Sequence, residues 1–94
     1  MMYEVFPSTQ FKKDLKNAKS RGKNLDLITK VIETLANGEQ LPEKYHDHQL
    51  TASRNYNGKM RECHIQPDWL LVYERDDNKL YLYLTRTGSH SDLF

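Results

Sequence analysis

The sequence has one cysteine, three prolines, four glycines and no long apolar run, and each scarcity excludes a class of protein. The single cysteine, Cys63, cannot form an internal disulfide, which excludes a disulfide-stapled secreted domain. No apolar stretch approaches the roughly 20 residues that a membrane-spanning helix needs. The first ten residues lack the basic start and the apolar stretch of a signal peptide. We therefore expect a cytoplasmic protein with no membrane partner.

The chain has 94 residues, the size of one small domain, and we expect residues 1–94 to form it. A chain this small buries only about 60–65% of the surface that its unfolded form exposes. Any active site should therefore be a shallow groove. Charged residues make up 29% and hydrophobic residues 37% of the chain, which is typical of a folded domain and not of a disordered one.

The net charge is only +1, but positive charge is concentrated near the N-terminus. Residues 11–30 carry seven basic and two acidic side chains, a local net charge of +5. The other residues carry seven basic and eleven acidic side chains, a net charge of −4. The basic segment is suited to phosphate backbones or to an acidic protein. A solvated helix face is the structural alternative.

The first third of the chain predicts a strand and a helical hairpin. Residues 2–6 are rich in β-formers and make a candidate strand. Ser8 can cap a first helix, whose apolar residues recur at spacings of three and four. A second helix can begin at Asn24 or Asp26 and end near Gly38.

The remainder predicts a β-meander after a polar stretch over residues 41–58, which we expect to be loop with short turns. The three strands are expected over residues 59–66, 69–75 and 80–86. Strict alternation in the third strand places Arg86 on the same face as Leu82 and Leu84. The fold class is therefore α+β: a two-helix hairpin packed on a small antiparallel sheet, in the order β-α-α-β-β-β plus a short C-terminal turn.

The C-terminal residues Arg-Thr-Gly-Ser-His-Ser-Asp-Leu-Phe contain a helix-capping pattern. A helical turn that starts at Ser89 places His90 and Phe94 four positions apart, on one face. This end of the chain is thus expected to be ordered and to lie near Arg86.

Chemistry-bearing side chains are dense after residue 45, where all four histidines occur: His46, His48, His64 and His90. RNA cleavage by its own 2′-hydroxyl needs a base, an acid and a group that stabilises negative charge on phosphorus. Histidine, aspartate and arginine supply these roles without a metal. Arginine suits phosphate because its planar fork can bind two oxygens.

Each candidate also has a structural alternative. Trp69 or Phe94 could stack a base, but Trp69 also fits the core and Phe94 could close the end of the sheet. Arg86 could simply pair with a carboxylate. A metal site could use His46, His48, Cys63 and His64, but it lacks the spacings that typify zinc sites. We expect no metal and no cofactor.

The motifs H-D-H-Q-L, R-E-C-H-I-Q-P-D-W-L-L-V-Y and T-R-T-G-S-H-S-D-L-F resemble the YafQ branch of the RelE/ParE toxin superfamily. The resemblance covers nearly the whole chain and is most specific in its C-terminal half. It implies a bacterial mRNA interferase that cuts mRNA in the ribosomal A site of the 30S subunit. It also implies a cognate DinJ-like ribbon-helix-helix antitoxin, with operator DNA bound only through the antitoxin complex.

The resemblance implies a residue set as well. The catalytic candidates that match the family motifs are His48, His64, Asp68, Arg86 and His90. Phe94 and Trp69 are the candidates for nucleotide binding. Because this chain is far less basic than many superfamily members, we expect ribosome docking through Lys12, Lys13 and Lys16 in the basic segment.

Two other functions remain open from the sequence. One is a ParE-like toxin that inhibits a topoisomerase without cutting RNA, although that activity has no evident use for several acid/base groups. The other is a non-catalytic binding module whose histidines are incidental. New mRNA ends in a translating extract would favour the nuclease, whereas blocked supercoiling would favour the ParE-like toxin.

Overall fold

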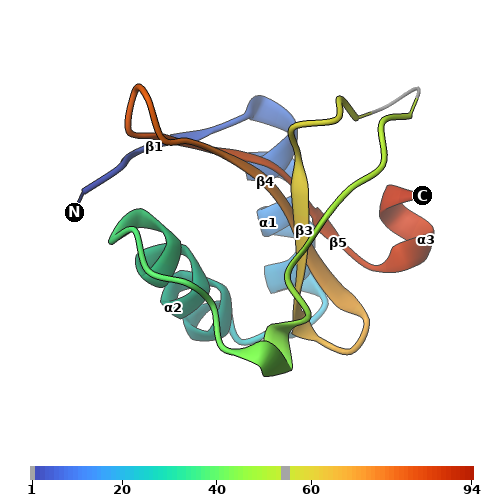
Figure 1. Cartoon of the computed structure of the whole chain (residues 1–94). Helices are drawn as coiled ribbons and strands as arrows, with labels where there is room; N and C mark the ends of the chain where they lie inside the picture. The colour runs from blue at the N-terminus through green and yellow to red at the C-terminus, as the bar shows by residue number, and fades with distance from the viewer. Residues whose placement is uncertain (1, 54–55) are drawn as a thin grey trace.

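The computed structural model describes residues 2–53 and 56–94 and confirms the predicted fold class. The first half holds β1 (Glu4–Pro7), α1 (Thr9–Ser20), α2 (Leu25–Ala36) and the 3₁₀ turn η1 (Glu43–Tyr45). The second half holds β2 (His48–Gln49), β3 (Arg61–Gln66), β4 (Trp69–Asp76), β5 (Tyr81–Gly88) and α3 (His90–Leu93) (Figure 1). In the described residues no helix has the length and apolar character to cross a membrane.

The helical hairpin forms where the capping residues predict it. The Ser8 hydroxyl accepts a hydrogen bond from the Phe11 amide at 2.9 Å, and α1 begins. The Asn24 side chain accepts from the Asp26 amide at 3.0 Å, and α2 begins. Between the helices Gly22 has a φ of 82°, a left-handed conformation that glycine adopts at low cost. Local sequence thus determines both helix starts and the turn between them.

The sheet has five strands in the order β1-β5-β4-β3-β2. The pairs β2–β3, β3–β4 and β4–β5 are antiparallel, whereas β1 pairs with β5 in parallel. The strand β2 and the turn η1 lie in the stretch that was predicted to be loop. A two-residue strand has no alternation that a sequence pattern could reveal, and pairing with β3 defines it.

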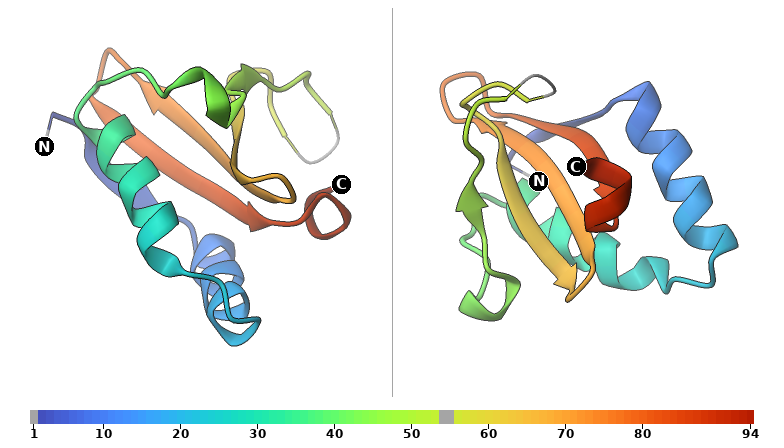
Figure 2. Two further views of the ribbon diagram at one scale, coloured as in Figure 1. Left: turned by 90° about the horizontal axis from the view of Figure 1, so that it is seen from below. Right: turned by 90° about the vertical axis from the view of Figure 1, so that its right-hand side faces the viewer.

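The two faces of the sheet carry separate hydrophobic clusters. Helices α1 and α2 cover one face, with the largest buried cluster between them and the sheet. The opposite face carries a smaller cluster in which Leu93 of α3 packs with Tyr56, Leu70 and Val72. Figure 2 shows α2 along the sheet and α3 at the end of β5. The short C-terminal helix is therefore packed on the sheet face that the hairpin leaves open.

A β-bulge in β5 corrects the predicted position of Arg86. Thr85 has no partner on β4, and Val72 pairs with Arg86 beyond it. An extra residue in one strand reverses the alternation that follows it. The prediction that Arg86 shares a face with Leu82 and Leu84 is therefore wrong. Arg86 lies on the face of Val72, where α3 also packs.

Candidate active site

The fold brings all four histidines together along one side of the molecule. The His64 ring lies in the middle, with ring centroids 5.7 Å from His46, 6.4 Å from His48 and 5.6 Å from His90. These residues come from the end of η1, β2, β3 and α3. The four rings therefore come from four separate elements, and we refer to His46, His48, His64 and His90 as the histidine cluster.

Strand register explains why several of these side chains share a face. His48 pairs with Glu62, Glu62 with Val72, and Val72 with Arg86. Directly paired residues project from the same side of a sheet, and strands lie about 4.8 Å apart. A row of side chains thus runs from His48 to Arg86 across four strands.

Glu62 is a member of this site that the sequence analysis missed. Its side chain is buried, and its Oε1 lies 3.4 Å from His64 Nε2 and 3.7 Å from His48 Nε2. A buried carboxylate between two imidazoles can fix the orientation of both rings. The available signal was its spacing from His64, since residues two apart in a strand share a face.

For the RNA cleavage that the resemblance implies, replacing Glu62 with glutamine is expected to lower the rate by about 10- to 100-fold, by analogy with the loss of a group that orients a metal-ligating histidine. The amide keeps the shape of the side chain but not its charge. Single-turnover cleavage of ribosome-bound mRNA measures the effect. Glu74→Gln, a matched change on β4, should cleave like the wild type. Equal cleavage rates for the Glu62→Gln and Glu74→Gln variants would show that Glu62 has no role in the site.

Asp68 and His90, two of the candidate residues from the sequence, lie in contact. The Asp68 Oδ1 accepts a hydrogen bond from the His90 amide at 3.0 Å and lies 2.9 Å from His90 Nδ1. The bonds from the His90 amide and ring lower the pKa of Asp68. An ionised Asp68 assigns the ring proton to Nδ1, and His90 Nε2 is then available to a substrate.

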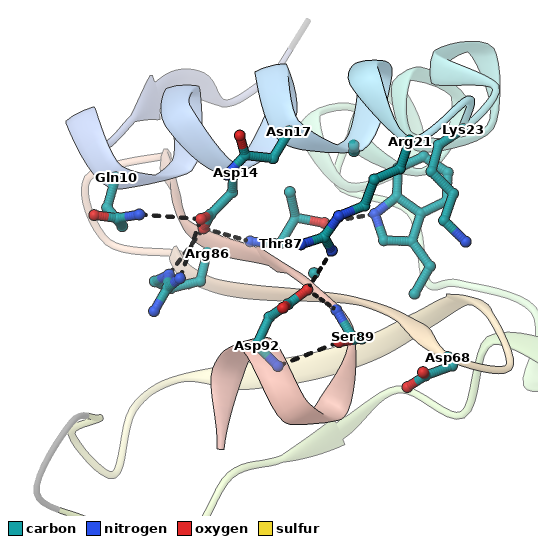
Figure 3. A pocket seen from close by; sticks show the side chains of 13 residues that line it. Gln10, Asp14, Asn17, Arg21, Lys23, Asp68, Arg86, Thr87, Ser89 and Asp92 are labelled. Carbon is teal, nitrogen blue, oxygen red and sulfur yellow. Dashed lines mark hydrogen bonds and ion pairs between the residues drawn. The ribbon is translucent and has the colours of Figure 1, made fainter.

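The C-terminal helix is ordered by two sets of contacts, as its capping pattern predicts. The Ser89 hydroxyl accepts from the Asp92 amide at 3.2 Å, and the Asp92 carboxylate accepts from the Ser89 amide at 3.0 Å. Arg21 at the end of α1 pairs with Asp92 at 2.7 Å, and this bond lowers the pKa of Asp92 (Figure 3). An ion pair therefore links α3, the helix that carries His90, to the end of α1.

Arg86 forms a two-point ion pair with Asp14 of α1 (Figure 3). Its Nε donates to Asp14 Oδ2 at 2.8 Å and its Nη2 donates to Oδ1 at 3.0 Å, while the Thr87 amide also donates to Oδ2 at 3.2 Å. Burial raises the pKa of Asp14, but these hydrogen bonds outweigh it and the net pKa is lowered. The predicted structural alternative for Arg86, a carboxylate pair, is thus present. The Arg86 side chain remains 28% exposed.

The two aromatic candidates differ in accessibility. Phe94 is 59% exposed and lies against Tyr56 with ring centroids 5.5 Å apart, so its ring does not close the end of the sheet and can stack on a base. Trp69 is only 1% exposed, and its Nε1 donates to Thr87 Oγ1 at 3.0 Å. The prediction that Trp69 binds a nucleotide is corrected accordingly, because its ring is covered by the core and by Lys23, whose Nζ lies over the ring 5.8 Å from its centroid. The three docking lysines, Lys12, Lys13 and Lys16, are all exposed on α1.

The metal site that the sequence left open does not form in its predicted composition. Cys63 is fully buried on the helix side of the sheet, and burial raises the pKa of its thiol to about 12. A different set, Glu62, His64 and His90, has ligand atoms within 4.8 Å of one another. Imidazole nitrogens with one carboxylate oxygen are donors that zinc and copper ions accept.

Comparison with known proteins gives consistent matches over nearly the whole chain. Residues 3–94 match the family model described as the bacterial toxin of type II toxin–antitoxin systems, YafQ. The mRNA interferase toxin YafQ of Escherichia coli strain B is 38% identical over 89 residues, which are 93% of this chain and 90% of the relative.

Two solved structures show the same fold. A metal-bound toxin from Helicobacter pylori is 41% identical, with a TM-score of 0.87 and full coverage of both chains. The toxin in the E. coli DinJ–YafQ complex is 35% identical, with a TM-score of 0.87 and 98% of each chain covered. Identity and coverage at this level indicate common ancestry along the entire described chain.

Proposed function

Because the chain belongs to the YafQ family of bacterial toxins of type II toxin–antitoxin systems, we propose that it is a ribosome-dependent endoribonuclease that stops translation by cutting mRNA in the A site. The single observation that carries the proposal is the contact of Asp68 with His90 beside His64 and Glu62. This arrangement provides several proton-transfer groups on an open surface. Residues 1–94 would act as one domain.

We assign the acid role to His90. The acid role uses the imidazolium form of His90, in which Nδ1–H donates to Asp68 and Nε2–H passes its proton to the departing 5′-oxygen, leaving the neutral ring with its proton on Nδ1. The engagement of Asp68 with His90 favours Asp68 as a positioning residue for the acid. His48, which lies near Glu62, is then the better candidate for the base that removes the 2′-hydroxyl proton.

The proposed reaction is an internal transesterification of the RNA. The 2′-oxygen forms a bond to phosphorus as the bond from phosphorus to the 5′-oxygen breaks. The products are a 2′,3′-cyclic phosphate and a 5′-hydroxyl. Arg86 would stabilise the negative charge that develops on the phosphorus oxygens, His64 would share the proton work, and Phe94 would hold a neighbouring base.

A partner follows from the family. The E. coli relative forms a complex with DinJ. We propose that a cognate ribbon-helix-helix antitoxin likewise neutralises this chain, and that operator DNA is bound through that complex only.

Mapping new 5′ ends on mRNA in a translating extract tests the function. Cuts in codon register, absent with His90→Ala, are expected. Intact mRNA together with blocked DNA supercoiling would instead support the ParE-like toxin. Intact mRNA without a supercoiling effect would support a binding module.

Charge reversal on α1 is expected to weaken docking to the ribosome. Lys12→Glu and Lys16→Glu together should raise the Kd for ribosomes by roughly 10-fold or more at about 0.1 M salt and reduce its salt dependence, because fewer phosphate counterions are released. Sedimentation with purified ribosomes measures both effects. The reversals Lys59→Glu and Lys79→Glu, which make the same charge change elsewhere, serve as the control. Salt-independent binding by the wild type would contradict an electrostatic dock.

A metal ion is expected to inhibit this site. A metal held by Glu62, His64 and His90 would occupy the two histidines of this set to which the proposed mechanism gives proton transfer. Added Zn²⁺ or Cu²⁺ should therefore stop cleavage, and a chelator should restore it. A chelator selective for Zn²⁺ and Cu²⁺, used with excess Mg²⁺ to keep the ribosomes intact, should leave the wild-type rate unchanged by itself, whereas a loss of activity under these conditions would show that such a metal takes part in the reaction.

A further inference from the structure

A cavity of about 450 Å³ lies directly beside the histidine cluster, between η1, the start of α2 and the end of β3. Its apolar and aromatic lining is Leu27, Tyr45, Ile65 and Pro67, and its polar lining is Lys44, His46, His64 and Gln66. We call this cavity the base pocket. The proposed mechanism assigns it no role, although His64 lines it and belongs to the histidine cluster.

Four of the residues that line the base pocket are apolar or aromatic. Leu27 of α2 is a large apolar side chain that is 37% exposed, and Tyr45 is partly buried, so both offer accessible surface to a ligand. Ile65 and Pro67 complete the apolar lining. Small-molecule sites are typically concave, largely apolar cavities of this size with a few polar groups at the edge.

His46 joins the base pocket to the histidine cluster. Its φ of 48° is a left-handed conformation that a non-glycine residue adopts only at a cost. In this conformation its carbonyl lies 2.8 Å from His48 Nδ1, and its ring packs edge-on against His64. The backbone turn that closes η1 therefore positions one wall of the pocket and one histidine of the cluster together.

We propose that the base pocket receives one unstacked nucleobase of the RNA, adjacent to the phosphate that the histidine cluster acts on. This inference rests on the proposed ribonuclease function. Single-stranded RNA is recognised by bases that leave the stack and pack on aromatic side chains. Tyr45 supplies such a ring. Lys44 Nζ lies over that ring, 5.1 Å from its centroid, and a base that stacks there would displace the ammonium group toward the flanking phosphate.

The occupant is a nucleobase and not an apolar peptide because of what surrounds the cavity. His64 both lines the cavity and lies 5.6 Å, centroid to centroid, from the His90 ring, so a ligand in the cavity lies next to the reacting phosphate. Its rim carries Lys44 and His46, which suit the polar edges of a base and the anionic backbone. The base pocket would therefore determine which nucleotide is tolerated beside the cut.

Programmed ribosomes with messages that differ in the A-site codon test the proposal. Tyr45→Ala should lower kcat/KM for the favoured codons by about 5- to 100-fold, the range expected for loss of one stacked base, and should flatten the base preference at one position. Tyr45→Phe, which keeps the ring, should behave like the wild type. Tyr81→Ala, a half-buried tyrosine on β5 away from the pocket, is the matched control.

Tyr45 also contacts the core, so Tyr45→Ala could lower activity by disturbing the fold. A second variant at an exposed position therefore tests the pocket independently. Leu27→Trp fills the cavity from an exposed position and should reduce kcat/KM in the same way, whereas Leu80→Trp, on another exposed leucine, should not. Unchanged kcat/KM and unchanged base preference in both Tyr45→Ala and Leu27→Trp would overturn the proposal.

Failure of the base-pocket proposal can be distinguished from failure of the proposed ribonuclease function. If the wild type cuts no mRNA, the ribonuclease proposal fails, and binding of a non-cleavable 2′-deoxy trinucleotide then decides the base pocket. Chemical-shift changes at Tyr45 and Ile65 in an NMR titration would support it. The absence of such changes would refute it.

Discussion

Replacing His90 with alanine is expected to lower the rate of mRNA cleavage by about 10²–10⁴-fold, the contribution of one positioned acid or base. The free energy of unfolding should change by no more than about 0.5 kcal/mol, because the side chain is 56% exposed and its ring bonds only Asp68. Single-turnover cleavage on programmed ribosomes measures the first effect, and urea denaturation measures the second.

Two further variants separate the roles within this pair. Ser91→Ala, on the same short helix, should keep the wild-type rate. Asp68→Asn should reduce the rate less than His90→Ala, since it releases the ring without removing it. Near-wild-type cleavage by His90→Ala would eliminate His90 as the acid, even if the other variants behaved as expected.

Replacing Arg86 with alanine is expected to reduce both cleavage and stability. Loss of one group that stabilises transition-state charge typically costs about 10²–10³-fold in rate. Stability should fall by about 1.5–3 kcal/mol, because the Asp14 carboxylate keeps its burial but loses two charge-assisted hydrogen bonds. Arg86→Lys keeps the charge but not the two-point geometry, so it should recover only part of each effect.

A double variant distinguishes chemistry from architecture at this ion pair. Adding Asp14→Asn to Arg86→Ala removes the uncompensated buried charge, so stability should partly return. Cleavage should not return if Arg86 stabilises the reacting phosphate. Recovery of both stability and cleavage in the double variant would show that Arg86 acts only as a structural partner of Asp14.

Features encoded in short stretches of sequence were predictable. Ser8, Asn24 and Ser89 cap helices where a capping residue precedes an apolar pattern. The β-meander follows from β-rich segments separated by turn residues. These signals depend only on neighbouring residues, so no knowledge of long-range contacts is needed to interpret them.

Features that arise from pairing between distant segments were not predictable. The bulge at Thr85, which moves Arg86 to the other face, depends on the register between β4 and β5. The partnership of Arg86 with Asp14 depends on where α1 lies beside β5. Glu62 was missed because its importance comes from the position of His48, which reaches it through the two-residue strand β2.

The most direct test of the account is cleavage of a message with one 2′-deoxy nucleotide at the cut position in the A site. The proposed reaction begins with attack by that 2′-hydroxyl, so the altered message should bind programmed ribosomes and remain intact. The all-ribose message should yield a 2′,3′-cyclic phosphate and a 5′-hydroxyl at the same position. Cleavage of the 2′-deoxy message at the wild-type rate would contradict the account, because the attacking group would then have to come from elsewhere.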